Sequence, residues 1–143
     1  MNLFQKYYNL SLKEKLTLGE AFILLVFIKM IVIFFPIRWY SYLFGKQQSE
    51  TEIFISNEYQ FKIFKIAQAI VRSRKLIPWK SKCLTEAIAA KIMLQRQNLQ
   101  STLYLGVNKK GDTMVAHAWL RCGNIYVTGR RGMNKFVVLS SFA

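Results

Sequence analysis

Two side chains of this 143-residue chain have the chemistry of a nucleophile and a base. Cys83 lies between Lys82 and Leu84, at the start of a segment with helical character, and His117 is the only histidine. A cysteine thiolate attacks carbonyl carbon, and an imidazole can take the thiol proton and later protonate the leaving group. The sequence therefore offers one candidate pair for nucleophilic catalysis. Whether the two residues meet depends on the elements that carry them.

The setting of Cys83 favours a reactive thiol. We expect Ser81 to be the N-cap of a helix that runs to about Gln97, which makes Cys83 its second residue. Three features of this position favour the thiolate over the thiol: the free first-turn amides, the helix dipole, and the flanking Lys80 and Lys82. The same amides can stabilise an oxyanion. The alternative is a buried, inert cysteine, which is common for lone thiols.

After Asn98 the pattern changes from helical to short β-prone segments, and His117 lies in one of them. Taken alone, a strand histidine is more often a packing residue than a catalytic one. If Gly123-Asn124 is a two-residue hairpin turn, Cys122 lies opposite Ile125 and Trp119 opposite Thr128. Thr128 would then share the face of His117, and Cys122 would point away into the core. The expected strands are 101–107, 113–122, 124–129 and 135–141.

Helices are expected to precede these strands. Ser11 and Glu14 form a capping box, and the apolar run 21–35 ends at Pro36. The run is shorter than the roughly 20 residues of a membrane span and contains Lys29. We expect a helix packed in the core or on a partner, with a helix at a membrane interface as the alternative. A polar loop (45–57) and a helix (58–73) follow.

The predicted fold class is thus α+β, with N-terminal helices before a nucleophile helix packed on a small antiparallel sheet. We divide the chain into an N-terminal apolar helical segment (1–57) and a core (58–143), together forming one compact unit. The composition, with 52% hydrophobic residues, excludes a disordered chain. Two cysteines and one histidine exclude a disulfide scaffold and any usual metal centre, so no cofactor is expected.

The positive charge is concentrated in the second part of the chain. The net charge is +14, of which residues 60–143 hold fifteen bases against Glu86 and Asp112. This part should attract an acidic peptide, protein, membrane or nucleic acid. We expect no nucleic-acid binding, since the sequence has no helix-turn-helix, zinc-finger or aromatic RNA motif. Without a secretory signal, the cytoplasm is the expected compartment, with association at the inner face of the membrane as an alternative.

A cysteine that opens a helix, with a histidine on a later strand, is the arrangement of papain-like and transglutaminase-like enzymes. The segments 78–107 (PWKSKCLTEAIAAKIMLQRQNLQSTLYLGV) and 116–129 (AHAWLRCGNIYVTG) resemble the lasso-peptide leader peptidases. These are the stand-alone protease halves of the lasso maturation B proteins, within the transglutaminase-like superfamily. The resemblance covers nearly the whole chain, including the Pro36-Ile37-Arg38 exit from the apolar helix.

This resemblance implies a cysteine peptidase that removes the leader from a ribosomally made precursor peptide, with Cys83 as nucleophile and His117 as base. It also implies partners: a leader-binding protein supplied in trans and a lasso cyclase that acts on the released core. Trp79 and Trp119 are candidates to line the substrate groove, although either could simply pack.

The chain departs from the family at the third catalytic position. Residues 124–143 contain no Asp or Glu, and both the hairpin register and the family alignment put the missing Asp at Thr128. A threonine hydroxyl can orient an imidazole but cannot balance its positive charge. A Cys–His dyad, another acceptor such as Asp112, and a non-catalytic interaction protein of the same maturation complex therefore stay open.

Overall fold

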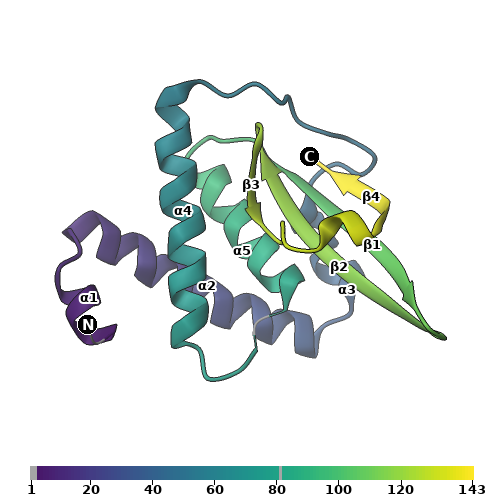
Figure 1. Cartoon of the computed structure of the whole chain (residues 1–143), viewed down its shortest axis with the longest axis horizontal. Helices are drawn as coiled ribbons and strands as arrows, with labels where there is room; N and C mark the ends of the chain where they lie inside the picture. The colour runs from purple at the N-terminus through teal and green to yellow at the C-terminus, as the bar shows by residue number, and fades with distance from the viewer. Residues whose placement is uncertain (1–2, 81) are drawn as a thin grey trace.

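The computed structural model describes residues 3–80 and 82–143, and it has helices first and an antiparallel sheet second (Figure 1). This confirms the predicted α+β class. The helices are α1 (Leu3–Tyr8), α2 (Leu12–Phe34), α3 (Ile37–Tyr40), α4 (Asn57–Leu76) and α5 (Cys83–Arg96), with a 3-10 turn, η1, at Ser41–Phe44. The strands are β1 (Thr102–Lys110), β2 (Thr113–Cys122), β3 (Ile125–Thr128) and β4 (Val137–Phe142), with a second 3-10 turn, η2, at Met133–Lys135.

The helix boundaries follow local signals in the sequence. The capping box is present at the start of α2, where the Ser11 hydroxyl accepts from the Glu14 amide and the Glu14 carboxylate accepts from the Ser11 amide. α2 then ends just before Pro36, and α4 ends two residues before Pro78. The start predicted for α2 by the capping box is confirmed, whereas α4 is longer than the predicted 58–73 because it continues to Leu76, two residues before Pro78.

The predicted start of α5 was wrong by one residue. Lys82, not Ser81, is the N-cap, since its backbone is extended and its carbonyl accepts the first helical hydrogen bond, from the Glu86 amide at 3.2 Å. Cys83 is therefore the first helical residue rather than the second. Ser81 itself lies outside the described residues. The amide of Cys83 still belongs to the first turn, where amides have no intrahelical partner.

The sheet has the strand order β3-β2-β1-β4, and all neighbouring strands are antiparallel. The predicted pairing of Cys122 with Ile125 is confirmed, but the predicted pairing of Trp119 with Thr128 was wrong. A bulge after Leu120 shifts the register, so that Thr128 lies opposite Leu120. Since directly opposed residues share a face, Thr128 lies with Leu120 and not with His117.

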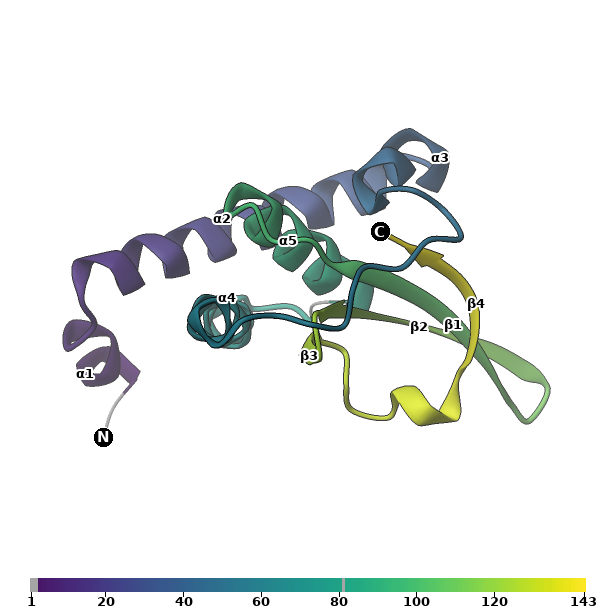
Figure 2. The ribbon, with the colours of Figure 1, turned by 90° about the horizontal axis from the view of Figure 1, so that it is seen from above.

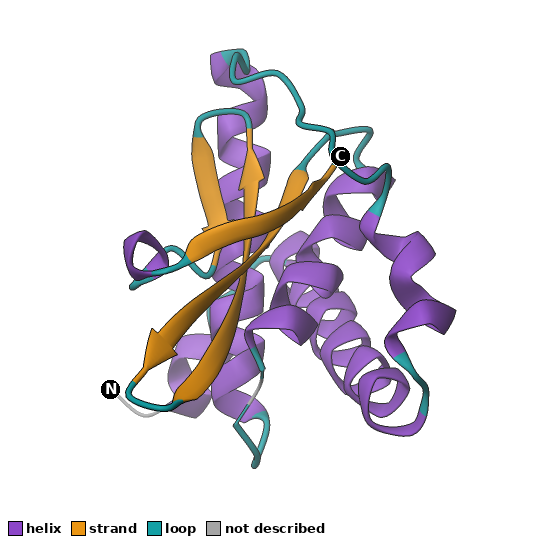
Figure 3. Cartoon of the chain, turned by 90° about the vertical axis from the view of Figure 1, so that its right-hand side faces the viewer, coloured by secondary structure: helices purple, strands orange, loops and turns teal. Residues whose placement is uncertain are grey.

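Helix α5 is the central element, because it packs against α2 and α4 on one side and against β2 and β3 on the other (Figures 2 and 3). Its segment 87–90 is fully buried, and the three alanines of this segment (Ala87, Ala89 and Ala90) allow close approach of the neighbouring elements. One hydrophobic core joins the residues of α2, α4 and α5 to Leu103, Leu120 and Cys122 of the sheet. The N-terminal helical segment therefore contributes to the same core as residues 58–143.

Helix α2 carries apolar side chains on the side that faces the core and also on the side that faces solvent. Ala21, Leu25 and Ile28 are buried against α4 and α5, whereas Ile23 and Phe27 on the other side are exposed. Among the described residues, α2 is the helix long and apolar enough to cross a membrane by length and composition. Much of its apolar surface is thus left uncovered by the rest of the chain.

Candidate active site

Cys83 is held at the first turn of α5, half-buried beside the hydrophobic core, and its thiol is free. The side chain of Lys82 makes no capping hydrogen bond to the first turn of the helix. Lys80 and Lys82, which precede Cys83 in the sequence, are both exposed.

The segment before Cys83 is fixed by helix α2. Lys29 donates from Nζ to the Lys80 carbonyl at 3.2 Å, and the same ammonium lies 5.7 Å from the centre of the Trp79 ring. Trp79 keeps 41% of its surface exposed, so it is available to a substrate as well as to Lys29. The mid-helix lysine that argued against a membrane span therefore has a local role, which is to hold residues 79 and 80.

A second tie to the start of α5 comes from α4. Arg74 lies 3.3 Å from a carboxylate oxygen of Glu86, and Glu86 is 8% exposed. Because Arg74 is near the end of α4 and Glu86 is in the first turn of α5, this ion pair joins the two ends of the loop that precedes Cys83. Both charges also suit their helix ends, a base in a last turn and an acid in a first turn.

His117 lies in the middle of β2 and is half-buried. Its Nε2 atom is 2.7 Å from the carbonyl oxygen of Gly129, which immediately follows β3. A carbonyl oxygen can only accept, so this hydrogen bond requires the ring proton on Nε2. In the neutral imidazole, Nδ1 is then the unprotonated nitrogen that can accept a proton from a thiol.

The imidazole belongs to a row of rings along one face of the sheet. Trp119 stacks on Tyr104 at 5.6 Å between centroids and on His117 at 5.7 Å, and Phe136 lies 4.9 Å from His117. At the far end, Arg121 donates from Nε to the Tyr104 hydroxyl at 3.0 Å. These contacts, together with the bond to Gly129, restrict rotation of the His117 ring.

Two glycines are needed for this arrangement. A side chain at Gly106 would meet the Trp119 ring within 3 Å, so the glycine makes room for the indole. Gly129 has a φ of +71°, and a Cβ there would overlap the Ala118 carbonyl oxygen and approach Trp119. Glycine is the residue that adopts this backbone at little cost. The position of the Gly129 carbonyl therefore depends on the absence of a side chain.

The predicted site residues are only partly brought together. Helix α5, which begins with Cys83, packs on the strand that carries His117, but no hydrogen bond joins these two described residues. Trp119 is 5% exposed, so it supports the imidazole more than it could line a groove. The Thr128 hydroxyl is buried and has no hydrogen-bond partner within residues 3–80 and 82–143. The structure does not place it on the imidazole.

The acceptor for His117 was missed by sequence reasoning because it is a backbone atom. Any residue has a carbonyl oxygen, so no residue type marks this role. The signal that was present is the glycine itself, at the end of a strand. Phe136 was missed as well, since it precedes β4 and reaches His117 only through the fold. Asp112, the other acceptor considered, lies in the exposed turn between β1 and β2.

Cys122 takes no part in this site. It is fully buried, its thiol is free, and it donates from Sγ to the Gln100 carbonyl at 3.2 Å. Burial raises the pKa of this thiol to about 11, so it stays protonated at neutral pH. The prediction that Cys122 is a core residue is confirmed. Among the described residues, no group of His, Cys, Asp and Glu could hold a metal ion.

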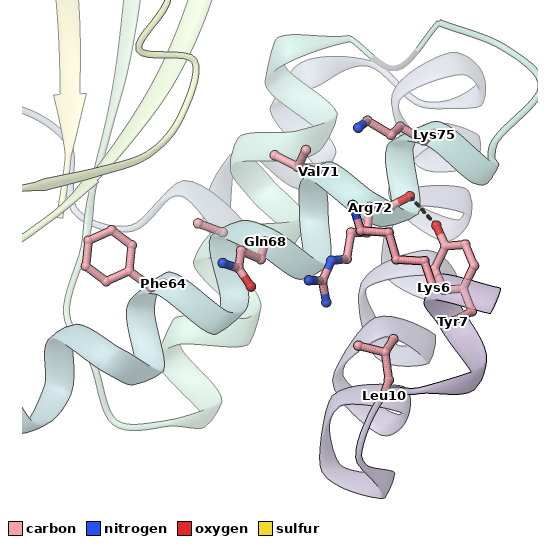
Figure 4. Close-up of a pocket in the computed structure, with 9 residues that line it drawn as sticks. Lys6, Tyr7, Leu10, Phe64, Gln68, Val71, Arg72 and Lys75 are labelled. Atoms are coloured by element: carbon pink, nitrogen blue, oxygen red, sulfur yellow. Dashed lines mark hydrogen bonds between the residues drawn. The ribbon is translucent and has the colours of Figure 1, made fainter. Parts of the chain in front are cut away.

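A cavity of about 340 Å³ lies away from these residues, between α1 and α4 (Figure 4). It is lined by cationic Lys6, Arg72 and Lys75 and by apolar side chains that include Phe64, and the Tyr7 hydroxyl donates to the Arg72 carbonyl. Neither Cys83 nor His117 contributes to it. The cavity is therefore not the place where a peptide bond would meet the thiol.

The comparisons with known proteins place the chain in a superfamily. The sequence profile of the transglutaminase-like superfamily matches residues 35–141, which is about three quarters of the chain. The protein therefore belongs to the transglutaminase-like superfamily. The match begins in the last turns of the N-terminal helices and continues to β4. No curated protein and no solved structure matches the chain.

Proposed function

We propose that this protein is a cysteine peptidase that removes the leader from a ribosomally made lasso-peptide precursor. The observation that carries the proposal is the hydrogen bond from His117 Nε2 to the Gly129 carbonyl. It leaves Nδ1 as the basic nitrogen of a ring whose orientation is fixed by Trp119 and Phe136. The resemblance of residues 78–107 and 116–129 to the lasso leader peptidases supplies the substrate class.

The reaction divides between the two residues as in other cysteine peptidases. His117 takes the thiol proton, and the sulfur of Cys83 attacks the scissile carbonyl carbon to form a tetrahedral oxyanion. We expect the Cys83 amide, in the first turn of α5, to donate to that oxygen. The C–N bond then breaks, His117 protonates the leaving amine of the core peptide, and water hydrolyses the thioester to release the leader.

The Gly129 carbonyl takes over part of the work of the missing carboxylate. As a dipole it holds the imidazole tautomer and orients the ring, and its partial negative charge stabilises the imidazolium more weakly than a full charge would. We therefore expect a working but slow peptidase. Thr128, at the aligned position of the family Asp, is not needed for this scheme.

The surroundings of the site favour an acidic peptide. Gly129 and Phe136 both contact His117. The segment between them carries three exposed basic residues: Arg130, Arg131 and Lys135. A peptide bound at His117 would thus lie close to the six-residue cationic segment 130–135. We propose that the leader contributes carboxylates here and that a separate leader-binding protein delivers it.

The test is cleavage of a purified precursor, with and without the leader-binding protein, followed by mass spectrometry of leader and core. We expect weak cleavage by the chain alone, stimulation by the partner, and none by Cys83→Ala at unchanged thermal stability. Cys122→Ala is the matched control, because it removes the buried thiol and should leave cleavage intact. Unchanged cleavage by Cys83→Ala would contradict the proposal.

A second candidate function is a non-catalytic interaction protein of the same maturation complex. It is favoured by two absences within residues 3–80 and 82–143: no hydrogen bond joins Cys83 to His117, and no carboxylate is hydrogen-bonded to the imidazole. Iodoacetamide labelling at mildly acidic pH separates the two candidates. An activated Cys83 labels rapidly and loses this property in His117→Ala, whereas a merely structural thiol labels slowly in both proteins.

A further inference from the structure

The side of α2 that faces away from the core carries a long apolar strip. We define the outer face of α2 as six side chains that are between 49% and 74% exposed: Leu12, Leu16, Ile23, Phe27, Met30 and Phe34. At about 100° per residue they fall within about 60° of one another around the helix. Over 22 residues the strip is about 33 Å long. Phe22 and Ile33, also exposed, widen it to about 140°.

This surface continues past the end of α2. Phe35, Ile37, Trp39 and Tyr42 are all exposed, and Figure 2 shows α3 following α2 along one side of the molecule, opposite the free part of the sheet. A patch of this length and composition is larger than a soluble monomer ordinarily exposes, so it marks an interaction surface. Tryptophan and tyrosine at one end are typical of residues that lie at the level of lipid headgroups.

The charges beside the outer face are positive. Lys15 and Lys29 lie at one margin of the strip and Arg38 lies among the aromatic residues of α3. The acid at the other margin, Glu20, is neutralised by Arg96 at 2.7 Å. An apolar strip with cationic margins is complementary to a bilayer that contains anionic lipid.

We propose that this protein docks on an anionic membrane surface through the outer face of α2 and the aromatic residues of α3. The helix lies in the plane of the membrane, with its apolar side chains in the headgroup and upper acyl region. The remaining chain, including the Cys83 and His117 side chains, stays on the aqueous side. This docking is independent of whether the protein cleaves a peptide.

A membrane span is disfavoured by what the inner side of α2 does. Leu25 and Ile28 are buried in the core, and the hydroxyl of buried Ser73 donates to the Leu18 carbonyl at 3.1 Å. Lys29, in the middle of the helix, donates to the Lys80 carbonyl beside the active-site loop. A span would remove all of these contacts and bury the Lys29 ammonium in hydrocarbon.

A helical protein partner fits the strip less well than lipid does. Spacings of four, three and four residues connect Ile23, Phe27, Met30 and Phe34, as in a coiled-coil seam, and Leu16 lies seven residues before Ile23. The seam position between Leu16 and Ile23, however, falls on Gly19 and Glu20. A coiled-coil partner needs an apolar knob at each such position, whereas a fluid lipid surface does not.

The test uses the full-length protein and vesicles of phosphatidylcholine, with and without phosphatidylglycerol. We expect co-sedimentation that is strongest with phosphatidylglycerol and that weakens as salt is added. Replacing two outer-face residues together, Ile23→Ser and Phe27→Ser, should lower the partition coefficient by about tenfold or more. The control is Phe54→Ser, the same change at a 91% exposed phenylalanine outside the face, which should bind as the unmodified protein does.

Three outcomes would overturn the proposal. The first is equal vesicle binding by the double variant and the unmodified protein. The second is a dimer in light scattering that the double variant makes monomeric, without vesicle binding by either protein, since this would assign the face to a second copy. The third is vesicle-bound protein that alkaline carbonate does not release, because this would indicate that α2 spans the bilayer. The double variant and Phe54→Ser should both have the unfolding temperature of the unmodified protein, which verifies that these substitutions leave the fold intact.

Discussion

The His117 ring and the Gly129 carbonyl are joined by a hydrogen bond of 2.7 Å between Nε2 and oxygen. The bond connects the middle of β2 to the residue that follows β3, across the bulge that begins after Leu120. It decides which ring nitrogen carries the proton, and so which nitrogen can act as a base. The third member of the candidate triad is therefore a backbone atom, at the residue after the aligned position of the family Asp.

Gly129→Ala tests this arrangement directly. The added Cβ would overlap the Ala118 carbonyl oxygen, and a left-handed backbone costs about 1–2 kcal/mol for an L-residue. We expect a lower unfolding temperature and a lower turnover of precursor, measured by calorimetry and by mass spectrometry. Gly132→Ala is the matched control, because Gly132 also has a positive φ but has open space around its Cβ position. Equal turnover in the two variants would separate the Gly129 carbonyl from catalysis.

His117→Ala should reduce turnover by about 10²–10⁴-fold, the usual contribution of a general base. The loss of one half-buried ring should leave the fold in place, because Trp119 keeps its stack on Tyr104. The measurement is the initial rate of leader release at saturating leader-binding protein. Full activity in this variant would show that the proton is taken by another group.

Thr128→Val and Thr128→Asp should have opposite effects on stability. The buried Thr128 hydroxyl has no partner in the described structure, so replacing it with a methyl should leave unfolding unchanged or stabilise the protein by up to about 1 kcal/mol. An aspartate there would bury a carboxylate beside Leu120, away from the imidazole, and should destabilise the protein without raising turnover. A faster Thr128→Asp enzyme would mean that the carboxylate reaches His117 after all.

Arg130 and Arg131 should contribute to substrate binding rather than to the chemical step. Both are exposed on the segment that connects the two His117 contacts, Gly129 and Phe136. We expect the double alanine variant to raise KM for an acidic precursor, leave kcat close to its original value, and weaken the salt dependence of kcat/KM. The double lysine variant keeps the charge and should retain most of the binding. A fall in kcat alone would contradict this role.

The free energy of unfolding should rise from about pH 8 to 9, stay nearly level up to about pH 10.5 and fall above that value. Burial lowers the pKa of Lys91 from 10.5 to about 8, so between these values the unfolded chain holds more protons and the free energy of unfolding rises with pH. Burial also raises the pKa of Cys122 from 9.0 to about 11, so between these values the native state holds an extra proton. This effect offsets the Lys91 rise up to about pH 10.5, and above that value the free energy of unfolding falls.

Urea unfolding at a series of pH values measures this curve. In Cys122→Ala the free energy of unfolding should continue to rise up to about pH 10.5, and in Lys91→Met the rise should be absent and the fall should begin near pH 9. Lys91→Met also removes the 2.7 Å hydrogen bond that Lys91 donates to the Ser101 carbonyl, which lowers the free energy of unfolding at every pH. For this variant, the pH dependence of the free energy of unfolding is therefore compared, and not its absolute value. A free energy of unfolding that is flat between about pH 8 and 11 would contradict the assignment to these two groups.

The elements of this fold could be predicted from the sequence because their signals are local. The Ser11–Glu14 capping box, the stops at Pro36 and Pro78, and the alternation of apolar residues in 113–122 each act within a few residues. The two reactive residue types could be found for the same reason. Cys83 begins a helix and His117 lies on a strand, as predicted, and only the helix start moved by one residue.

The relation of His117 to its neighbours was decided by the tertiary structure. The bulge after Leu120 lies in a strand pair that packs on α5, and nothing in the spacing of Trp119 and Thr128 reveals it. The acceptor for the imidazole is a carbonyl oxygen, which every residue possesses, so residue types alone point to side chains and miss it. The exposure of one apolar side of α2 is likewise invisible in a sequence that is apolar on both sides, because burial depends on which neighbours the fold brings to each side.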